Sequence, residues 1–255
     1  MKKLHFLFFA IFVSVLFFNC QNETNTSSSN QATSHEEERI HDHHDHNHGD
    51  DHHGHDHHHD DEVPITVISD YGKIENQIYS NQLFDFQIQI PESWHVIDQE
   101  AMAKATEQGM DLVEENEDGS PSEAERIANS QLLNISQFPI TSDVANNSTL
   151  MITADNIAPF PEIQNGKNYL EHTKETFQAM GMEIEIIDDV SEKTISNRKF
   201  HQLEIKINFG DGSISQQYIS AVVKDYIFNI VLTYGNEESK MELEKILNSY
   251  HSLSS

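Results

Sequence analysis

Apolar side chains occur in two separate parts of this chain, with a strongly polar stretch between them. Residues 6–18 are apolar apart from Ser14, whereas residues 21–62 contain almost no apolar side chain and cannot form a core. Regular alternation of apolar and polar positions begins only near residue 78. We therefore expect one folded domain over residues 78–255, long enough to bury a sizeable core, preceded by a linker over residues 63–77.

The first half of this domain is expected to contain strands and two helices. A half-buried strand over residues 86–90 is indicated by three apolar side chains that alternate with glutamines. Helices are expected to begin at Asp98 and at Ser120, because the side chains of both residues can cap a free backbone amide. Two further strands are predicted over residues 132–138 and 150–157.

The second half is expected to be mostly β-structure between two helices. The first helix has apolar positions at helical spacing, and it stops at Gly181. Four strands with short turns follow, over residues 183–190, 199–209, 213–224 and 226–234. A last helix begins after Asn236, and its apolar stripe consists of Leu243, Ile246, Leu247, Tyr250 and Leu253. We predict an α+β fold, an antiparallel sheet with helices packed on it.

A loose motif at the start of the domain gives this pattern a family resemblance. The motif has the form F-x-I-x-I-P-x-x-W, and its members are Phe86, Ile88, Ile90, Pro91 and Trp94. With the long middle insertion, the strand meander and the ending EESKMELEKILNSY, it resembles the PsbP-like and Mog-like α/β/α sandwich family, which includes DcrB-like bacterial lipoproteins. The resemblance covers roughly residues 78–255. It implies a binding or assembly module, as on photosystem II or Ran GTPase, without a shared catalytic motif.

The N-terminus has the features of a secretion signal. Two lysines precede the apolar run, which is too short to span a bilayer comfortably. The run is followed by Cys20, so residues 1–19 resemble the signal peptide of a bacterial lipoprotein. In lipoproteins the cysteine that follows the signal peptide is lipidated, and the resemblance implies the same for Cys20. Phe17 and Asn19 depart from the branched aliphatic and small residues usual before that cysteine. An uncleaved anchor or ordinary secretion is the alternative.

A histidine-rich tract follows the polar spacer of residues 20–34. The tract, residues 35–62, contains 12 histidines, 11 acids and one arginine, and its composition predicts a disordered segment. Imidazole is a good ligand for Zn²⁺, Ni²⁺ and Cu²⁺, so the tract is a candidate site for loosely bound, exchangeable metal. The expected ligands are His41, His43, His44, His46, His48, His52, His53, His55, His57, His58 and His59.

Protonation of these imidazoles is expected to release metal. With all histidines neutral the tract carries a net charge of −10, and full protonation would bring it to +2. Free histidine titrates near pH ~6.5, so the change falls in the mildly acidic range. The alternative is that the tract is only a hydrated spacer and that its histidines have no biological role.

Charge and motif content exclude several function classes. The chain carries a net charge of −28, to which residues 63–255 contribute 31 acids and 12 bases. This acidity argues against nucleic acid and anionic lipid surfaces as partners. The single cysteine excludes an intrachain disulfide. No zinc-protease, nucleophile-elbow, P-loop or dinucleotide motif is present, so we expect no catalytic residue and no enzyme activity, although carboxylates dispersed in sequence can still meet in a fold.

The histidines outside the tract, and the single tryptophan, have simpler interpretations. Scattered histidines are more typical of a protein surface than of a metal site, and His95, His172, His201 and His251 are of this kind. Trp94 is most simply an anchor in the core.

The sequence as a whole predicts a bacterial cell-envelope protein that is lipid-anchored to the membrane. Its tract would bind or buffer divalent transition metals, and its folded domain would be a non-catalytic binding domain with a possible envelope protein as partner. The alternative is an envelope assembly or interaction lipoprotein in which the tract is a spacer. Neither hypothesis involves nucleic acid.

Overall fold

The structure is a computed structural model, and the residues it describes belong to one compact unit. The signal sequence, the spacer, the histidine tract and the two helices expected after Asp98 and Ser120 lie outside the described residues. Within the described part of the chain, no helix is both long and apolar enough to cross a membrane. The described residues are 68–98, 131–142, 144, 146–158, 160–179, 183–209 and 212–254.

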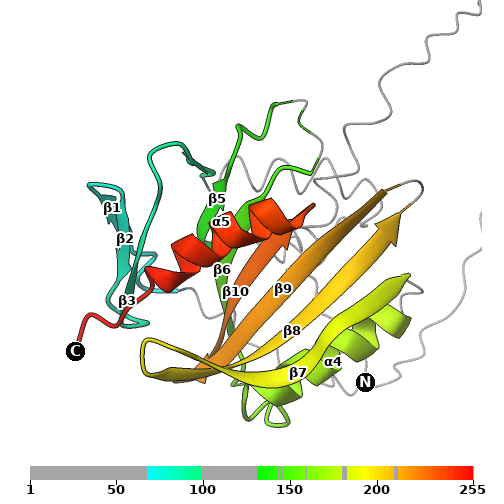
Figure 1. Ribbon diagram of the computed structural model, residues 1–255. Coiled ribbons are helices and arrows are strands. Elements are labelled where there is room, and N and C mark those ends of the chain that lie inside the picture. Colours follow the sequence, from blue (N-terminus) through cyan, green and yellow to red (C-terminus); the bar gives the residue numbers. More distant parts are fainter. Residues whose placement is uncertain are drawn as a thin grey trace, which may run out of the picture. The chain divides into compact units, whose positions relative to one another are not determined.

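A seven-stranded antiparallel sheet is the centre of the fold (Figure 1). In spatial order, its strands are β4 (His95–Val96), β5 (Gln131–Ser136), β6 (Thr149–Asn156), β10 (Tyr226–Tyr234), β9 (Gly212–Val223), β8 (Arg198–Phe209) and β7 (Ile184–Ile195). A second, three-stranded antiparallel sheet consists of β1 (Lys73–Glu75), β2 (Ile78–Asn81) and β3 (Phe86–Gln89). The helices are α4 (Gly166–Ala179) and α5 (Glu237–Asn248).

The large sheet is covered on both faces. Strand β10 is central and almost wholly buried, and its side chains alternate between two apolar clusters. Phe228 and Ile230 pack in the cluster that contains α5 and the small sheet, whereas Ile227 and Val231 pack in the one that contains α4. Figure 1 shows α5 on one face of the sheet and α4 on the other. The predicted α+β class, with helices packed on an antiparallel sheet, is therefore confirmed.

Helix α5 begins where the sequence predicts it. The Asn236 side chain accepts a hydrogen bond from the Ser239 amide at 2.9 Å, which satisfies one of the free donors of the first turn. Glu237 and Glu238 favour the same end through the helix dipole. The helix ends at Asn248, however, so the prediction that Tyr250 and Leu253 belong to its apolar stripe was wrong. After this helix the chain leaves in an extended conformation toward β3.

Strand β7 is longer than expected. The prediction ended this strand at residue 190, but it continues to Ile195 and turns back into β8 through Ser196 and Asn197. Both turn residues have positive φ, 45° and 68°, as in the tight hairpin turns that match strand twist. Most of β7 is exposed and carries two register shifts, so its sequence lacks the regular apolar alternation that marks a strand.

Ordered structure also occurs within residues 63–77, which the sequence analysis assigned to a linker. Strand β1 lies in this range and pairs with β2, and Ile68 is buried in the core at 4% exposure. The Asp70 carboxylate accepts hydrogen bonds from the backbone amides of Gly72 and Gln82 at 2.8 and 3.1 Å. The Asp70 carboxylate therefore links the turn before β1 to the turn after β2.

An aromatic cluster connects the small sheet, the large sheet and the end of α5. The Phe86 ring lies 5.1 Å from that of Phe228 and stacks on Tyr250 at 5.3 Å. The Phe200 ring contacts Tyr250 edge-on at 5.9 Å. Full burial of one such side chain stabilises the fold by about 1.5–3 kcal/mol. Trp94 is also buried in this cluster, as predicted.

Gly166 is the position at which α4 comes closest to the sheet. A Cβ added there would lie 2.1 Å from the carbonyl oxygen of Ser220 in β9 and 2.7 Å from its carbonyl carbon. The helix starts beside this contact because the Asn165 side chain accepts from the Asn168 amide at 3.0 Å.

Gly166→Ala is therefore expected to lower the free energy of unfolding by about 1–3 kcal/mol, because the methyl group would have to displace backbone. Chemical denaturation followed by circular dichroism measures this change. Lys167→Ala, at an exposed position one residue later, is the matched control and should change stability by less than about 0.5 kcal/mol. Equal stability of the two variants would contradict the close contact.

Candidate functional site

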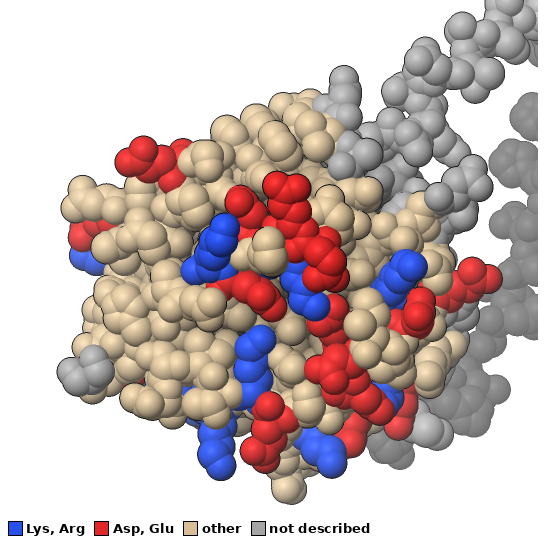
Figure 2. All heavy atoms as spheres, in the orientation of Figure 1, with Lys and Arg blue, Asp and Glu red and all other residues tan. Residues whose placement is uncertain are grey.

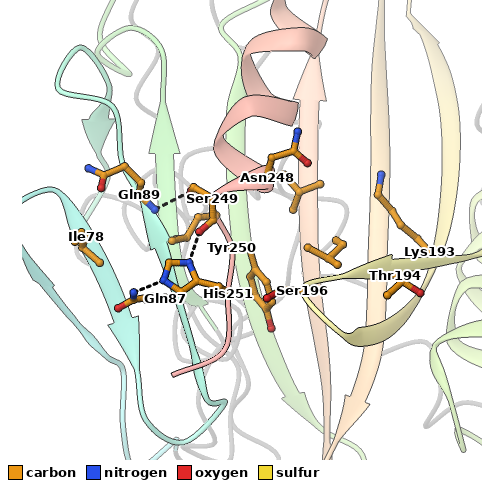
Figure 3. Close-up of a pocket in the computed structure, with 13 residues that line it drawn as sticks. Ile78, Gln87, Gln89, Lys193, Thr194, Ser196, Asn248, Ser249, Tyr250 and His251 are labelled. Atoms are coloured by element: carbon orange, nitrogen blue, oxygen red, sulfur yellow. Dashed lines mark hydrogen bonds between the residues drawn. The ribbon is translucent and has the colours of Figure 1, made fainter. Parts of the chain in front are cut away.

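A groove of about 590 Å³ lies between the small sheet and the edge of the large one. Its walls come from β3, from the end of β7 and from the residues at and after the end of α5. Figure 3 shows Gln87 and Gln89 on one side, Lys193 and Thr194 on the opposite side, and His251 between them. A volume of this size is typical of sites for small molecules.

Amide side chains are prominent in the groove, and three of them, Gln87, Gln89 and Asn248, lie along it. The aliphatic lining residues Ile88, Ile195 and Leu247 belong to the core beneath it and are almost fully buried. No carboxylate is among its lining residues. Figure 2 shows acidic side chains gathered over α5 and the strands beside it, while the part of this face over the small sheet carries few charges.

We call residues 249–254 the strap, and the first three of them line one wall of the groove. The strap adds to the free edge of β3: the Gln87 amide donates to the His251 carbonyl at 2.9 Å, and the His251 amide donates back at 3.1 Å. The Gln89 amide donates to the Ser249 hydroxyl at 2.9 Å. The backbone amide and carbonyl of Gln87 and the amide of Gln89 are therefore already paired within the chain.

The His251 imidazole makes contacts through both of its nitrogens. Its Nε2 contacts the side-chain amide of Gln87. Its Nδ1 lies 2.8 Å from the carbonyl oxygen of Ser249, which can only accept, so Nδ1 donates. Both contacts hold the strap in place.

Two charged side chains hold the strap against the body of the domain. Arg198 Nη1 donates to the Phe84 carbonyl at 2.9 Å and to the Tyr250 hydroxyl at 2.8 Å. The Asp85 carboxylate accepts from the Ser252 hydroxyl at 2.6 Å and from the Ser254 amide at 3.0 Å. Hydrogen bonds from these serines lower the pKa of Asp85, and burial raises the pKa of Tyr250 to about 12.

A buried ion pair lies beside the groove, on the sheet face next to α5. Glu204 of β8 accepts from Lys240 of α5 at 2.8 and 2.9 Å, and from the Tyr234 hydroxyl at 2.6 Å. Burial, followed by the hydrogen bond to Glu204, raises the pKa of Tyr234. These bonds satisfy the Glu204 carboxylate, which is only 7% exposed.

Lys193 of β7 lines the groove and has no such partner. Among the described residues its ammonium group forms no hydrogen bond and no ion pair within 4.0 Å. Partial burial lowers the pKa of Lys193; Glu244 opposes that shift and Lys240 reinforces it. Sequence patterns alone gave no reason to select this residue, because its position relative to the groove depends on the β7–β8 hairpin.

The histidines of the folded domain that the structure describes lie on different elements. Cys20 and all the histidines expected to bind metal lie outside the described residues. His95 is exposed on β4, His172 lies on α4, and His201 lies on β8. In the described ranges, no three histidine, cysteine or acidic residues are grouped so that they could hold a metal ion.

Comparisons with known proteins find structural likeness without a sequence match. No family model matches the chain, and no curated protein does either. Three solved structures are similar in fold: cyanobacterial PsbP from Synechocystis sp. PCC 6803, the Ran-binding protein Mog1p of Saccharomyces cerevisiae, and LpqN of Mycobacterium tuberculosis, which is described as involved in cell envelope biogenesis.

The sequence identities and TM-scores of these matches are low, although each match covers more than half of both chains. The PsbP structure is 12% identical, with a TM-score of 0.44, and the match covers 71% of this chain and 98% of that one. The corresponding values are 8%, 0.38, 71% and 97% for Mog1p, and 12%, 0.33, 64% and 78% for LpqN. Both families named in the predicted resemblance are thus among the similar structures. The likeness is one of fold alone.

The strap is expected to respond to pH through Asp85. Because its pKa is lowered in the folded protein, its contribution to stability is present above the ordinary value of 3.8 and is lost as the pH falls through the lower folded value. The NMR signal of the Ser254 amide should therefore titrate with a midpoint below 3.8. Asp85→Asn should abolish that titration, whereas Asp225→Asn, in the exposed β9–β10 turn, should leave it intact. A Ser254 signal that does not move with pH would show that the carboxylate does not hold the strap.

Proposed function

We propose that this chain is a lipid-anchored cell-envelope protein that binds or buffers divalent transition metals near the membrane. The histidine tract of residues 35–62 would take up the metal, with Zn²⁺, Ni²⁺ and Cu²⁺ as the candidate ions. The folded domain would be a non-catalytic binding domain. The acyl chains on Cys20 would hold both parts at the membrane.

The observation that carries the metal proposal is the density of histidines in the tract. Twelve occur between His35 and His59, and many are adjacent or two residues apart. In an extended segment, side chains two residues apart point the same way, so neighbouring imidazoles can bind one ion with little backbone strain. Zinc prefers about four ligands, so these histidines alone supply at most about three sites.

A second candidate function is envelope assembly or interaction, with the tract as a spacer. The observation that favours it is the groove, which places amide and ammonium groups together in the folded domain and lies outside the tract. The two candidates differ in one measurable property, because only the first requires metal to bind to the tract.

The metal proposal predicts that the full chain binds more than one Zn²⁺ and that the ions exchange readily. A matched variant has the 12 histidines of residues 35–59 replaced by asparagine, which keeps the length of the chain and its formal charge. This variant should lose the zinc binding, as measured by competition with a chromophoric chelator. In the full chain the affinity should also fall between pH ~7.5 and pH ~5.5, because protonated imidazole cannot bind metal.

Unchanged zinc binding in the variant would overturn the assignment of metal to the tract. Equal zinc affinity at the two pH values would overturn the assignment of imidazole as the metal ligand. If neither protein binds zinc, the assembly proposal is favoured.

The lipid anchor predicts that cells incorporate labelled palmitate into the chain at Cys20. Cys20→Ala should remove the label and release the protein from the membrane fraction, because no other cysteine is present. Ser27→Ala, in the polar spacer, is the control and should keep both. Persistent membrane association of Cys20→Ala without label would instead support the uncleaved anchor.

A further inference from the structure

The loop between β5 and β6, residues 137–148, exposes large apolar side chains. Phe138 is 39% exposed and Val144 is 37% exposed, and Pro139 beside Phe138 is exposed as well. Figure 1 shows this loop projecting beyond the ends of the two strands. We call Phe138, Pro139 and Val144 the apolar tip. Exposed apolar residues that share one short loop, unlike single scattered ones, indicate a contact surface.

The backbone of the apolar tip is paired within the loop itself. The Asn147 side chain accepts from the Phe138 amide at 3.0 Å and donates to the Phe138 carbonyl at 2.8 Å. The Ser136 hydroxyl donates to the same carbonyl at 2.7 Å. The Pro139 carbonyl accepts from the Ser142 amide at 2.9 Å and from the Ser142 hydroxyl at 2.6 Å.

This pairing matters for the kind of surface that the tip can meet. A backbone segment enters an apolar medium at low cost only when its amides and carbonyls already have partners. At Phe138 and Pro139 every backbone polar group has one, since proline has no amide hydrogen. Loss of water around the tip would therefore leave none of these groups unpaired.

The loop is nearly uncharged in a strongly acidic domain. Residues 137–148 contain one charged residue, Asp143, whereas residues 63–255 contain 31 acids and 12 bases. The loop has no lysine or arginine with which to attract anionic lipid, and the charge of the domain opposes an anionic surface. An apolar, uncharged tip instead suits the interface of a zwitterionic bilayer, where no ion has to lose its water.

The length of chain before the domain allows this contact. Residues 21–67 separate Cys20 from Ile68, the first described residue, and an unstructured linker of that length has an r.m.s. reach of roughly 35–40 Å. A domain of this size is also about 40 Å across. An anchor at Cys20 would thus keep the domain beside the bilayer without selecting which face meets it.

We propose that the apolar tip inserts into the interface of a zwitterionic bilayer and so orients the anchored domain on the membrane. Phe138 and Val144 would enter the boundary between headgroups and acyl chains, and Asn147 would hold the backbone of Phe138 in the shape that enters. The proposal rests on the membrane anchor of the proposed function. It does not depend on metal binding by the tract.

The test couples the chain from Cys20 onward, through its only thiol, to a maleimide lipid in phosphatidylcholine vesicles. This coupling replaces the acyl chains, so the result does not depend on whether cells lipidate Cys20. A tryptophan at position 138 or 144 reports insertion, because bromine on the lipid acyl chains quenches an indole that lies among them. The native Trp94 is only 6% exposed and supplies the baseline.

Phe138→Trp and Val144→Trp should each lose about half or more of the added fluorescence in brominated vesicles, since an interfacial group lies roughly 5–10 Å into that boundary. Ile74→Trp is the matched control, because Ile74 on β1 is 42% exposed and lies outside the tip. Its quenching should not exceed the baseline. Addition of Phe138→Ser to Val144→Trp should remove the quenching at position 144, because the apolar surface that enters is then too small.

Absence of quenching at both positions 138 and 144 would overturn the proposal and leave the apolar tip to a protein partner. Equal quenching at position 74 would also overturn it, because the domain would then have no preferred orientation. Brominated phosphatidylglycerol in place of phosphatidylcholine should weaken the quenching, and stronger quenching would contradict apolar insertion. Failure of palmitate labelling at Cys20 bears on the anchor alone, so the two failures are distinguishable.

Discussion

The stacking of Phe86 on Tyr250, and the contact of both with the aromatic rings of the large sheet, hold together three parts of the domain that are distant in sequence. Without this cluster the small sheet would lose its support, because its three short strands have too little apolar surface to be stable alone. The groove exists because these parts meet at their apolar sides and leave their polar edges apart. Its geometry thus depends on core packing more than on any bond within it.

Burial and charge divide the α5 side of the large sheet into two chemically different regions. Glu204 has direct partners in Lys240 and Tyr234, and removal of one member of such a buried ion pair is strongly destabilising because it leaves the other charge buried and unpaired. Around Lys193 the charged group is left without a direct partner. The two lysines differ in the elements to which they belong. Lys240 belongs to the helix that packs on Glu204, whereas Lys193 belongs to the strand at the edge of the sheet.

The sequence alone was enough to predict the elements whose apolar and polar residues follow a regular pattern. It was not enough to predict the elements that depend on single polar contacts. The buried alternation of β10 and the Asn236 cap of α5 were both visible as patterns. The small sheet's first strand was not, because it depends on the Asp70 carboxylate and on pairing with β2. For the candidate site, Lys193 and His251 became significant only through neighbours that are remote in sequence, such as Gln87. The histidine tract is the opposite case, because the metal binding proposed for it was inferred from its composition alone.

The strap also constrains the order in which the domain can be completed. Gln87 and His251 form one wall of the groove, and they are separated by 164 positions in the chain. During synthesis, β3 emerges early and can pair with β2, but it cannot pair with the strap until nearly all the other described residues have followed. A partly emerged chain therefore has an open strand edge and no groove. The groove is therefore complete only when both ends of the described domain have folded together.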